Sequence, residues 1–184
     1  NKNKLNIMIM NEYLAKFDES IGGTSLKEHS IKTAMIANNI LKYKECNSER
    51  VIKNAIIASI FHDCGKTSKS FQEYLTSTDS EIESPGHNSV GAELFSNIVK
   101  LKNKEDENVI RDIIEFHHTP FTKETYLCDL YPTTTDIANV IEYYRNIVNE
   151  VEVLLGIDLG ITFATIDENF EEKLRNLGAN IKVI

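Results

Sequence analysis

The sequence is poor in cysteine, and its three cysteines form no recognisable framework. Cys46, Cys64 and Cys128 are odd in number, and no pair is spaced as Cys-x-x-Cys. A disulfide-stapled scaffold and a thiolate zinc site are therefore both unexpected. We expect Cys64, which lies between Asp63 and Gly65, to be a small packed residue rather than a reactive thiol.

Long hydrophobic runs are also absent. No apolar stretch approaches the roughly 18 to 20 residues that a membrane-spanning helix needs, and the stretch after Asn1-Lys2-Asn3-Lys4 is too short for a secretory signal. We therefore expect no membrane partner and a cytoplasmic location. The length of 184 residues is enough for one well-buried core, so we expect one domain over residues 1–184.

Basic residues are outnumbered, with 20 Lys and Arg against 28 Asp and Glu, which gives a formal net charge of −8. Proteins that grip nucleic acid by themselves usually present a basic face. A substrate that carries phosphate would therefore have to be held locally. Bound divalent cations could do this, as could lysines close to the motifs, namely Lys66, Lys69 and Lys123.

Hydrophobic residues recur at helical spacing almost throughout, without sustained alternation or an internal repeat. This pattern predicts an all-α fold. We expect helices at residues 5–17, 26–43, 48–63, 68–76, 88–102, 106–118, 136–155 and 168–177, with loops at 76–86 and 119–135. Residues 157–166 are rich in β-branched side chains and are typical of either a short strand or a turn.

The five histidines fall in four short segments, which cluster them with Asp, Gly and small polar residues near the ends of predicted helices. A single histidine is more often a hydrogen-bonded core or surface residue than a ligand. Five in this arrangement indicate a metal site, because imidazole and carboxylate suit first-row transition ions. The segments are Glu28-His29-Ser30, Phe61-His62-Asp63-Cys64-Gly65-Lys66, Gly86-His87-Asn88-Ser89 and Phe116-His117-His118.

Two of these segments contain adjacent candidate ligands, His62-Asp63 and His117-His118. Each pair ends a predicted helix, where free carbonyls and the helix dipole favour a cation. Neighbouring residues on a helix point about 100° apart. An adjacent pair is therefore expected to serve two neighbouring ions more easily than it chelates one, which predicts two ions side by side.

The order of these motifs resembles the HD metal-dependent phosphohydrolase superfamily, whose signature is the Phe-His-Asp-Cys-Gly-Lys segment after an apolar helix. The fuller pattern is similar to one branch, the HD nuclease domain of type I CRISPR systems. That domain occurs fused ahead of a superfamily 2 helicase or as a separate subunit beside one. The matching segments are Leu26-Lys27-Glu28-His29-Ser30, His62-Asp63-x-Gly65-Lys66, Ser68-Lys69-x-Phe71-Gln72-x-Tyr74-Leu75, Gly86-His87-x-x-x-Gly91-Ala92 and His117-His118-Thr119-Pro120.

The resemblance implies an HD-domain helical bundle with a dinuclear site. Asp63 would bridge two divalent transition-metal ions, either Mn, Fe, Co or Ni, with Mg as a further candidate. Lys66 would contact the scissile phosphate; its plainer alternative is a lysine that caps the helix ending at Asp63. The implied ligands are His29, His62 and Asp63 for the first ion and Asp63, His87, His117 and His118 for the second.

The family also supplies a further aspartate to the first ion, and here the sequence departs from the pattern. Asp136 opens a predicted helix, where an acidic residue is also an ordinary stabiliser of the N-terminus. Asp158 and Asp167 are alternatives, as is a residue beyond Ile184. None of the three is followed by the small residue and serine that are usual for that motif.

The resemblance implies a single-stranded DNA nuclease that uses two-metal hydrolysis, with Asp63 and Lys66 as catalytic residues and no protein nucleophile. Its expected partners are single-stranded DNA, a superfamily 2 helicase and a CRISPR surveillance complex. Two alternatives remain: an HD phosphohydrolase that acts on nucleotides or cyclic dinucleotides, and a non-catalytic adaptor. The paired histidines and the absence of a Gly-Tyr-Pro segment favour the nuclease over the phosphohydrolase.

Overall fold

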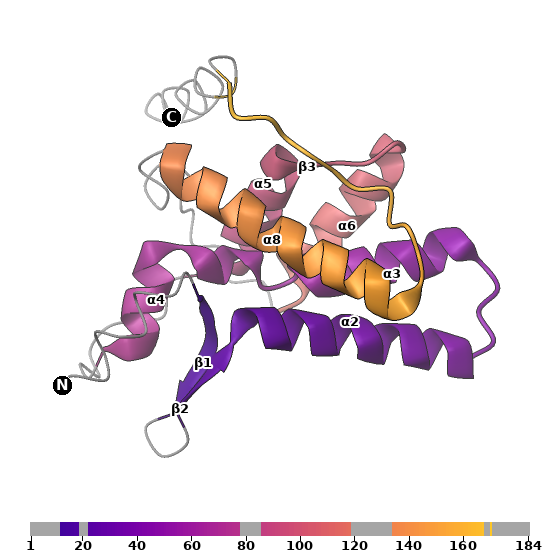
Figure 1. Cartoon of the computed structure of the whole chain (residues 1–184), viewed down its shortest axis with the longest axis horizontal. Helices are drawn as coiled ribbons and strands as arrows, with labels where there is room; N and C mark the ends of the chain where they lie inside the picture. The colour runs from indigo at the N-terminus through magenta and orange to yellow at the C-terminus, as the bar shows by residue number, and fades with distance from the viewer. Residues whose placement is uncertain (1–11, 19–21, 78–85, 119–133, 168–169, 171–184) are drawn as a thin grey trace.

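The computed structural model describes residues 12–18, 22–77, 86–118, 134–167 and 170. Helices make up most of the described chain, with two small two-stranded sheets at its edges (Figure 1). The predicted all-α class is therefore confirmed. None of the helices in these ranges is long and apolar enough to span a membrane. The predicted helix at 168–177, apart from Phe170, and most of both predicted loops lie outside the described residues.

An antiparallel hairpin of two helices forms one side of the bundle. Helix α2 (Leu26–Tyr43) begins after Ser25, whose hydroxyl accepts a hydrogen bond from the backbone N–H of Glu28. Helix α3 (Glu49–Phe61) returns beside it. The first turn of α2 and the C-terminal end of α3 therefore lie together, which places His29 near His62.

Helices α3 and α6 (Lys104–Phe116) run side by side in the same direction, and each has 13 residues. Near their N-termini, Arg50 donates to Asp106 over 2.6 Å and to Glu105 over 2.9 Å. At their C-terminal ends, the rings of His62 and His117 lie 5.4 Å apart. Because the helices are equal in length and aligned at their starts, the residues that follow both of them meet at one end.

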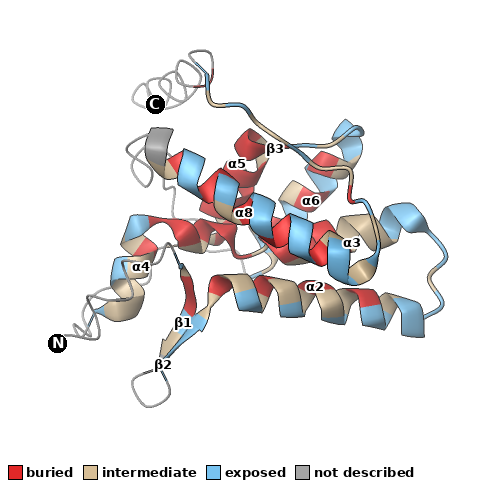
Figure 2. Ribbon diagram, viewed as in Figure 1, coloured by how far each residue is buried: buried red, intermediate tan, exposed pale blue. Residues whose placement is uncertain are grey.

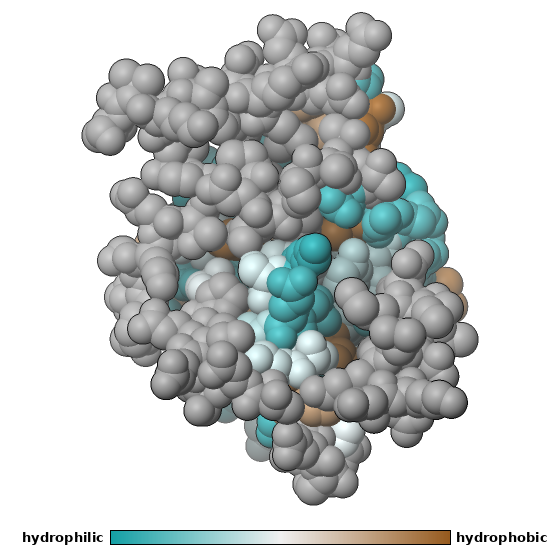
Figure 3. Space-filling model, turned by 90° about the vertical axis from the view of Figure 1, so that its left-hand side faces the viewer, coloured by the Kyte–Doolittle hydropathy of each residue, from teal (hydrophilic) through white to brown (hydrophobic). Residues whose placement is uncertain are grey.

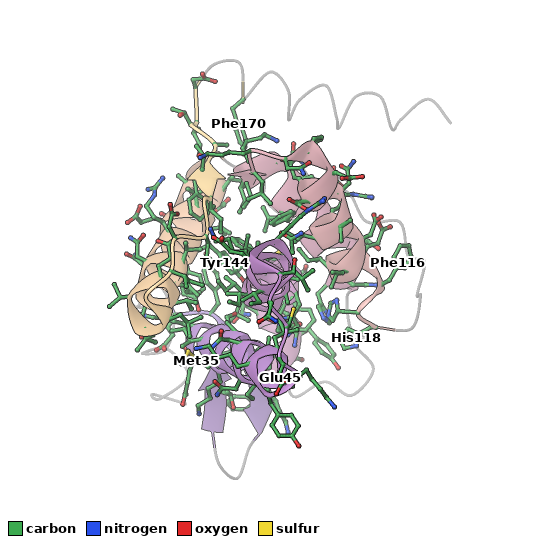
Figure 4. The ribbon with its side chains drawn as sticks, turned by 90° about the vertical axis from the view of Figure 1, so that its right-hand side faces the viewer. Met35, Glu45, Phe116, His118, Tyr144 and Phe170 are labelled. Carbon is green, nitrogen blue, oxygen red and sulfur yellow. The ribbon has the colours of Figure 1, made fainter. Side chains whose placement is uncertain are left out.

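Helix α5 (Asn88–Ile98) packs against α6, and the long helix α8 (Thr134–Leu155) crosses α2. One side of α8 is buried and the other is exposed (Figure 2). Phe61 of α3 stacks on Tyr144 of α8 at 4.7 Å and meets Phe95 of α5 edge-on at 5.3 Å. Tyr144 points from α8 toward the middle of the bundle (Figure 4). These three buried rings tie three helices to one core.

Two short elements follow α3 and complete the region around Asp63. The 3-10 helix η2 (Cys64–Thr67) begins directly after Asp63, and helix α4 (Lys69–Thr76) begins after Ser68, whose hydroxyl accepts from the N–H of Phe71. Cys64 is fully buried and its thiol donates to the carbonyl of Gly91 over 3.1 Å. Burial raises the pKa of this thiol, which fits the predicted packing role. On the side of the molecule where α4 lies, the described surface is mixed in hydropathy (Figure 3).

The predicted helix at 5–17 is wrong over its described part, where Leu14–Asp18 is strand β1. This strand pairs in antiparallel fashion with β2 (Gly22–Ser25), and a bulge between Leu14 and Lys16 lets Leu14 and Ala15 both be buried. Strict alternation is lost where Leu14 and Ala15 are adjacent and both buried, and this is why the sequence pattern predicts a helix there. Pairing with β2 and a contact with Gln72 decide the local structure, so tertiary context overrides propensity here.

The predicted helix at 88–102 is too long. Helix α5 ends at Ile98, and Val99–Lys100 forms strand β3, which pairs with β4 (Thr162–Phe163). The ambiguous segment 157–166 therefore contains a short strand. Its partner lies more than sixty residues earlier in the chain, which helical periodicity at 88–102 cannot reveal.

We predict that Phe61→Ala lowers the free energy of unfolding by about 3–5 kcal/mol, because it removes the ring that α5 and α8 share and leaves a cavity. Urea denaturation measures this change. Tyr43→Ala is the control, since Tyr43 is 83% exposed and its loss should change stability by no more than about 0.5 kcal/mol. Equal effects of the two substitutions would contradict a core centred on Phe61.

Candidate metal centre

The carboxylate of Asp63 lies at the centre of all five histidines, and its side chain is 3% exposed. Its two oxygens face different imidazoles. Oδ2 lies 3.2 Å from His29 Nε2 and 3.3 Å from His62 Nε2. Oδ1 lies 3.1 Å from His87 Nε2 and 3.6 Å from His117 Nε2. The carboxylate is therefore shared by two groups of nitrogen ligands.

Each of these groups is compact enough to hold a metal ion. His29, His62 and Asp63 form one group, and Asp63, His87, His117 and His118 form the other, with the ligand atoms of each group within 4.8 Å of one another. His118 is the exposed member, and it lies between α6 and α2 in Figure 4. The structure thus brings together all six ligands expected from the sequence.

Backbone carbonyls fix the orientation of two imidazoles. His62 Nδ1 lies 2.8 Å from the carbonyl oxygen of Ser59, and His117 Nδ1 lies 2.6 Å from that of Ile114. A carbonyl oxygen only accepts, so Nδ1 of each ring must carry the proton. In the neutral form of each ring, Nε2 then keeps its lone pair, and this is the tautomer that binds metals.

The same geometry leaves polar atoms without partners. Asp63 Oδ1, His87 Nε2 and His117 Nε2 are buried and make no hydrogen bond within the described part of the chain. When the His117 ring is neutral, its Nε2 faces Asp63 Oδ1 as one acceptor against another. Such a contact is unfavourable unless a cation lies between the two atoms. The donor set therefore fits divalent metal, and imidazole nitrogen with a single carboxylate suits a first-row transition ion.

Protonation also favours metal binding. Burial raises the pKa of Asp63, but the four imidazoles around it outweigh burial and hold the pKa well below its ordinary value. Burial lowers the pKa of His87 and that of His118. The carboxylate is therefore anionic and these two imidazoles tend to be neutral, and these are the forms that bind cations.

Glycine permits the close backbone approach that places His87 beside Asp63. A Cβ on Gly65 would lie 1.9 Å from the carbonyl oxygen of His87, so only glycine fits. Asn88 adds a second constraint, because its amide donates to the carbonyl of Glu115 over 2.8 Å. This bond ties the start of α5 to the end of α6. The sequence motif contains Gly65 and Asn88, but their neighbours are visible only in the fold.

The expectation that an adjacent pair serves two ions better than one is wrong for His117-His118. Both residues belong to the same group, and their ring centroids are 4.2 Å apart. Both residues follow Phe116, the last residue of α6, and the two imidazoles are long enough to converge although His117 keeps an αR backbone. His62 and Asp63 likewise follow the last residue of α3 and share a group, although Asp63 also reaches the other one.

Lys66 lies against Asp63 rather than against the end of α3. Its ammonium is 2.8 Å from Asp63 Oδ2 and donates to the carbonyl of Ala15 over 3.3 Å. The capping alternative is therefore not the arrangement seen. Phe71 lies beside the ammonium at 5.7 Å and contacts the His87 ring at 5.1 Å.

The aspartates considered as a further ligand lie outside both groups within the described residues. Asp158 accepts from the N–H of Gly160, and Asp167 accepts from that of Phe170, so both stabilise local turns. Asp136 lies in the first turn of α8 and raises the pKa of Tyr13, after burial as the larger cause. The group around His29 therefore has three protein ligands, while the other has four.

Comparison with known protein families gives a match that covers the elements that carry the site. The family described as HD domain matches residues 26–157, which is more than half of the chain. The chain belongs to the HD domain family. HD domains bind divalent metals, and the cluster around Asp63 is able to hold one. No curated protein and no solved structure matches the chain.

We predict that Gly65→Ala disrupts the site, because the added methyl would push η2 away from the carbonyl of His87. The metal content after reconstitution with Mn²⁺ should fall and the melting temperature should drop. Gly86→Ala is the matched control, since it adjoins His87 but its Cβ would meet nothing closer than 3.9 Å. A variant Gly65→Ala with normal metal content would show that this approach does not position His87.

We predict that single ligand variants separate the two groups. The wild-type chain should hold about two transition ions. His29→Ala and His117→Ala should each retain about one, whereas Asp63→Ala should lose both because its two oxygens serve both groups. Elemental analysis after dialysis measures the stoichiometry. Full metal content in Asp63→Ala would rule out the bridging position.

Proposed function

We propose that this HD domain is a metal-dependent nuclease that hydrolyses phosphodiester bonds of single-stranded DNA. The observation that carries the proposal is the division of the Asp63 oxygens between two groups of imidazoles. Two adjacent divalent ions, when bound, polarise the phosphoryl oxygens and lower the pKa of water so that it can attack phosphorus. The activity class of the family, metal-dependent hydrolysis, supports the proposal.

The residues of the chain have separate roles in this reaction. The single buried carboxylate of Asp63 supplies the negative charge that faces both metal positions. Backbone carbonyls hold the rings of His62 and His117 in fixed orientations, so their Nε2 atoms need no rearrangement to bind metal. Lys66 is the cation next to this carboxylate, and we assign it to the non-bridging oxygens of the scissile phosphate.

Two features favour a nuclease over a phosphohydrolase of nucleotides or cyclic dinucleotides. His118 joins His117 in one group, so the paired histidines of the nuclease pattern both belong to the site. Phe71 and Gln72, which also belong to that pattern, contact residues of the site. The adaptor alternative is disfavoured because the described cluster retains ligands for two positions.

The charge of the chain suggests how the substrate is supplied. With a net charge of −8, the domain has little general attraction for DNA, and a phosphate held at the metal centre provides most of the attachment. We therefore propose that a superfamily 2 helicase, fused or separate, delivers the single strand. We further propose that both act with a CRISPR surveillance complex in the cytoplasm.

We predict that the Mn²⁺-reconstituted protein cleaves circular single-stranded DNA without sequence preference and leaves blunt duplex largely intact. His117→Ala and His118→Ala should each reduce the rate by about two orders of magnitude or more. Their circular dichroism should stay helical, because both residues lie beyond the end of α6. Gel assays with time courses give the rates, and adding a helicase with ATP should make duplex a substrate.

The same assay separates the alternatives. Hydrolysis of nucleotides or cyclic dinucleotides without DNA cleavage would replace the nuclease with the phosphohydrolase. Metal binding without any hydrolysis would favour the adaptor. Equal rates on duplex and on single strands would contradict the need for a helicase.

A further inference from the structure

The ammonium of Lys66 shares one particular oxygen of Asp63 with one particular group of ligands. It lies 2.8 Å from Oδ2, which is the oxygen that faces His29 and His62. The other oxygen, Oδ1, faces His87 and His117. The ammonium therefore stands where a cation bound by His29 and His62 would meet the carboxylate.

Several contacts hold this ammonium in place. The carbonyl of Ala15 in β1 accepts from it, and the Phe71 ring lies 5.7 Å away, so the side chain is only 15% exposed. Gln72 holds the backbone on both sides of this ammonium in place. Its amide group accepts from the N–H of Leu14 over 2.9 Å and donates to the carbonyls of Leu14 over 2.9 Å and of Lys66 over 2.7 Å. One side chain thus joins the strand to η2.

The position of Lys66 makes the two groups unequal. The group on the Oδ2 side has three protein ligands and the one on the Oδ1 side has four. A divalent ion on the Oδ2 side must also displace a charge-assisted hydrogen bond and approach a fixed positive charge. Both effects weaken metal binding by the group on the Oδ2 side, which already has fewer ligands.

We propose that Lys66 is a resident cation that makes metal loading sequential. The group with His87, His117 and His118 binds first, while Lys66 occupies Oδ2. Binding of the second ion by His29 and His62 then releases Lys66 from Asp63. This inference rests on the metal centre of the proposed function and deepens it, since the released ammonium becomes available to a substrate phosphate only when both positions are filled.

The test is a Co²⁺ titration of the metal-free protein by isothermal calorimetry, which resolves a tight and a weak binding step. In Lys66→Met, the weak step should become tighter by about tenfold or more, because the competing hydrogen bond and the nearby charge are gone. The tight step should change by less than about threefold. Lys69→Met is the matched control: it also removes one positive charge, but Lys69 is exposed and pairs with Glu73. Its two steps should match those of the wild type.

A second measurement needs no variant and so does not depend on the folding of Lys66→Met. Acetylation of the wild-type protein by an amine-reactive reagent, followed by mass spectrometry, reports the accessibility of each lysine. The reactivity of Lys66 relative to Lys69 should be low without metal and should rise severalfold only when the second equivalent of Co²⁺ is added.

A weak step in Lys66→Met that is unchanged or weaker than in the wild type overturns the inference. So does Lys66 reactivity that ignores the second equivalent. Wild-type protein that binds no Co²⁺ would remove the proposed function as well. Normal two-step binding with an unchanged weak step in Lys66→Met would remove only the role of Lys66, so the two failures can be told apart.

Discussion

The buried negative charge of Asp63 is the constraint on which the rest of the site depends. A carboxylate that is 3% exposed is costly to ionise unless charges or hydrogen bonds compensate it. Four imidazole nitrogens and one ammonium lie within 3.6 Å of its oxygens. Backbone groups orient two of those imidazoles, and these groups are in place only in the folded chain. Compensation of one charge therefore links the C-terminal ends of α3 and α6 to the starts of α2 and α5.

The helical core sets where these ends lie. His29 and His117 are 88 positions apart in the chain, so no local rule brings them together. The pairs between Arg50 and the first turn of α6 align α6 with α3, and the stacked ring of Phe61 holds α3 against α8 one residue before His62. The geometry of the centre is thus a consequence of packing, and a cavity near Phe61 would disturb ligands that it does not touch.

The sequence was sufficient for features that depend on local pattern, and insufficient for features that depend on distant pairing. The helices and the candidate ligands could be predicted because apolar spacing and side-chain chemistry are local properties. Strand β1 could not, because β2 and the amide of Gln72 determine it. The division of the Asp63 oxygens and the joint grouping of His117 and His118 depend on where α3 and α6 stop. A difference of one or two residues in a helix end decides such geometry.

Charge at the centre also bears on how an acidic chain would act on the anionic substrate of the proposed function. The protein as a whole carries a net charge of −8, so its long-range field repels DNA and is weakened by salt. Attraction must come from groups within a few ångströms of the phosphate. In the structure, the ammonium of Lys66 forms an ion pair with Asp63, so its positive charge is already neutralised. Under the proposed loading order, an attractive site arises only when divalent cations replace that ammonium on the carboxylate. Affinity for phosphate and occupancy by metal are then coupled through one side chain, without any change in the helical core.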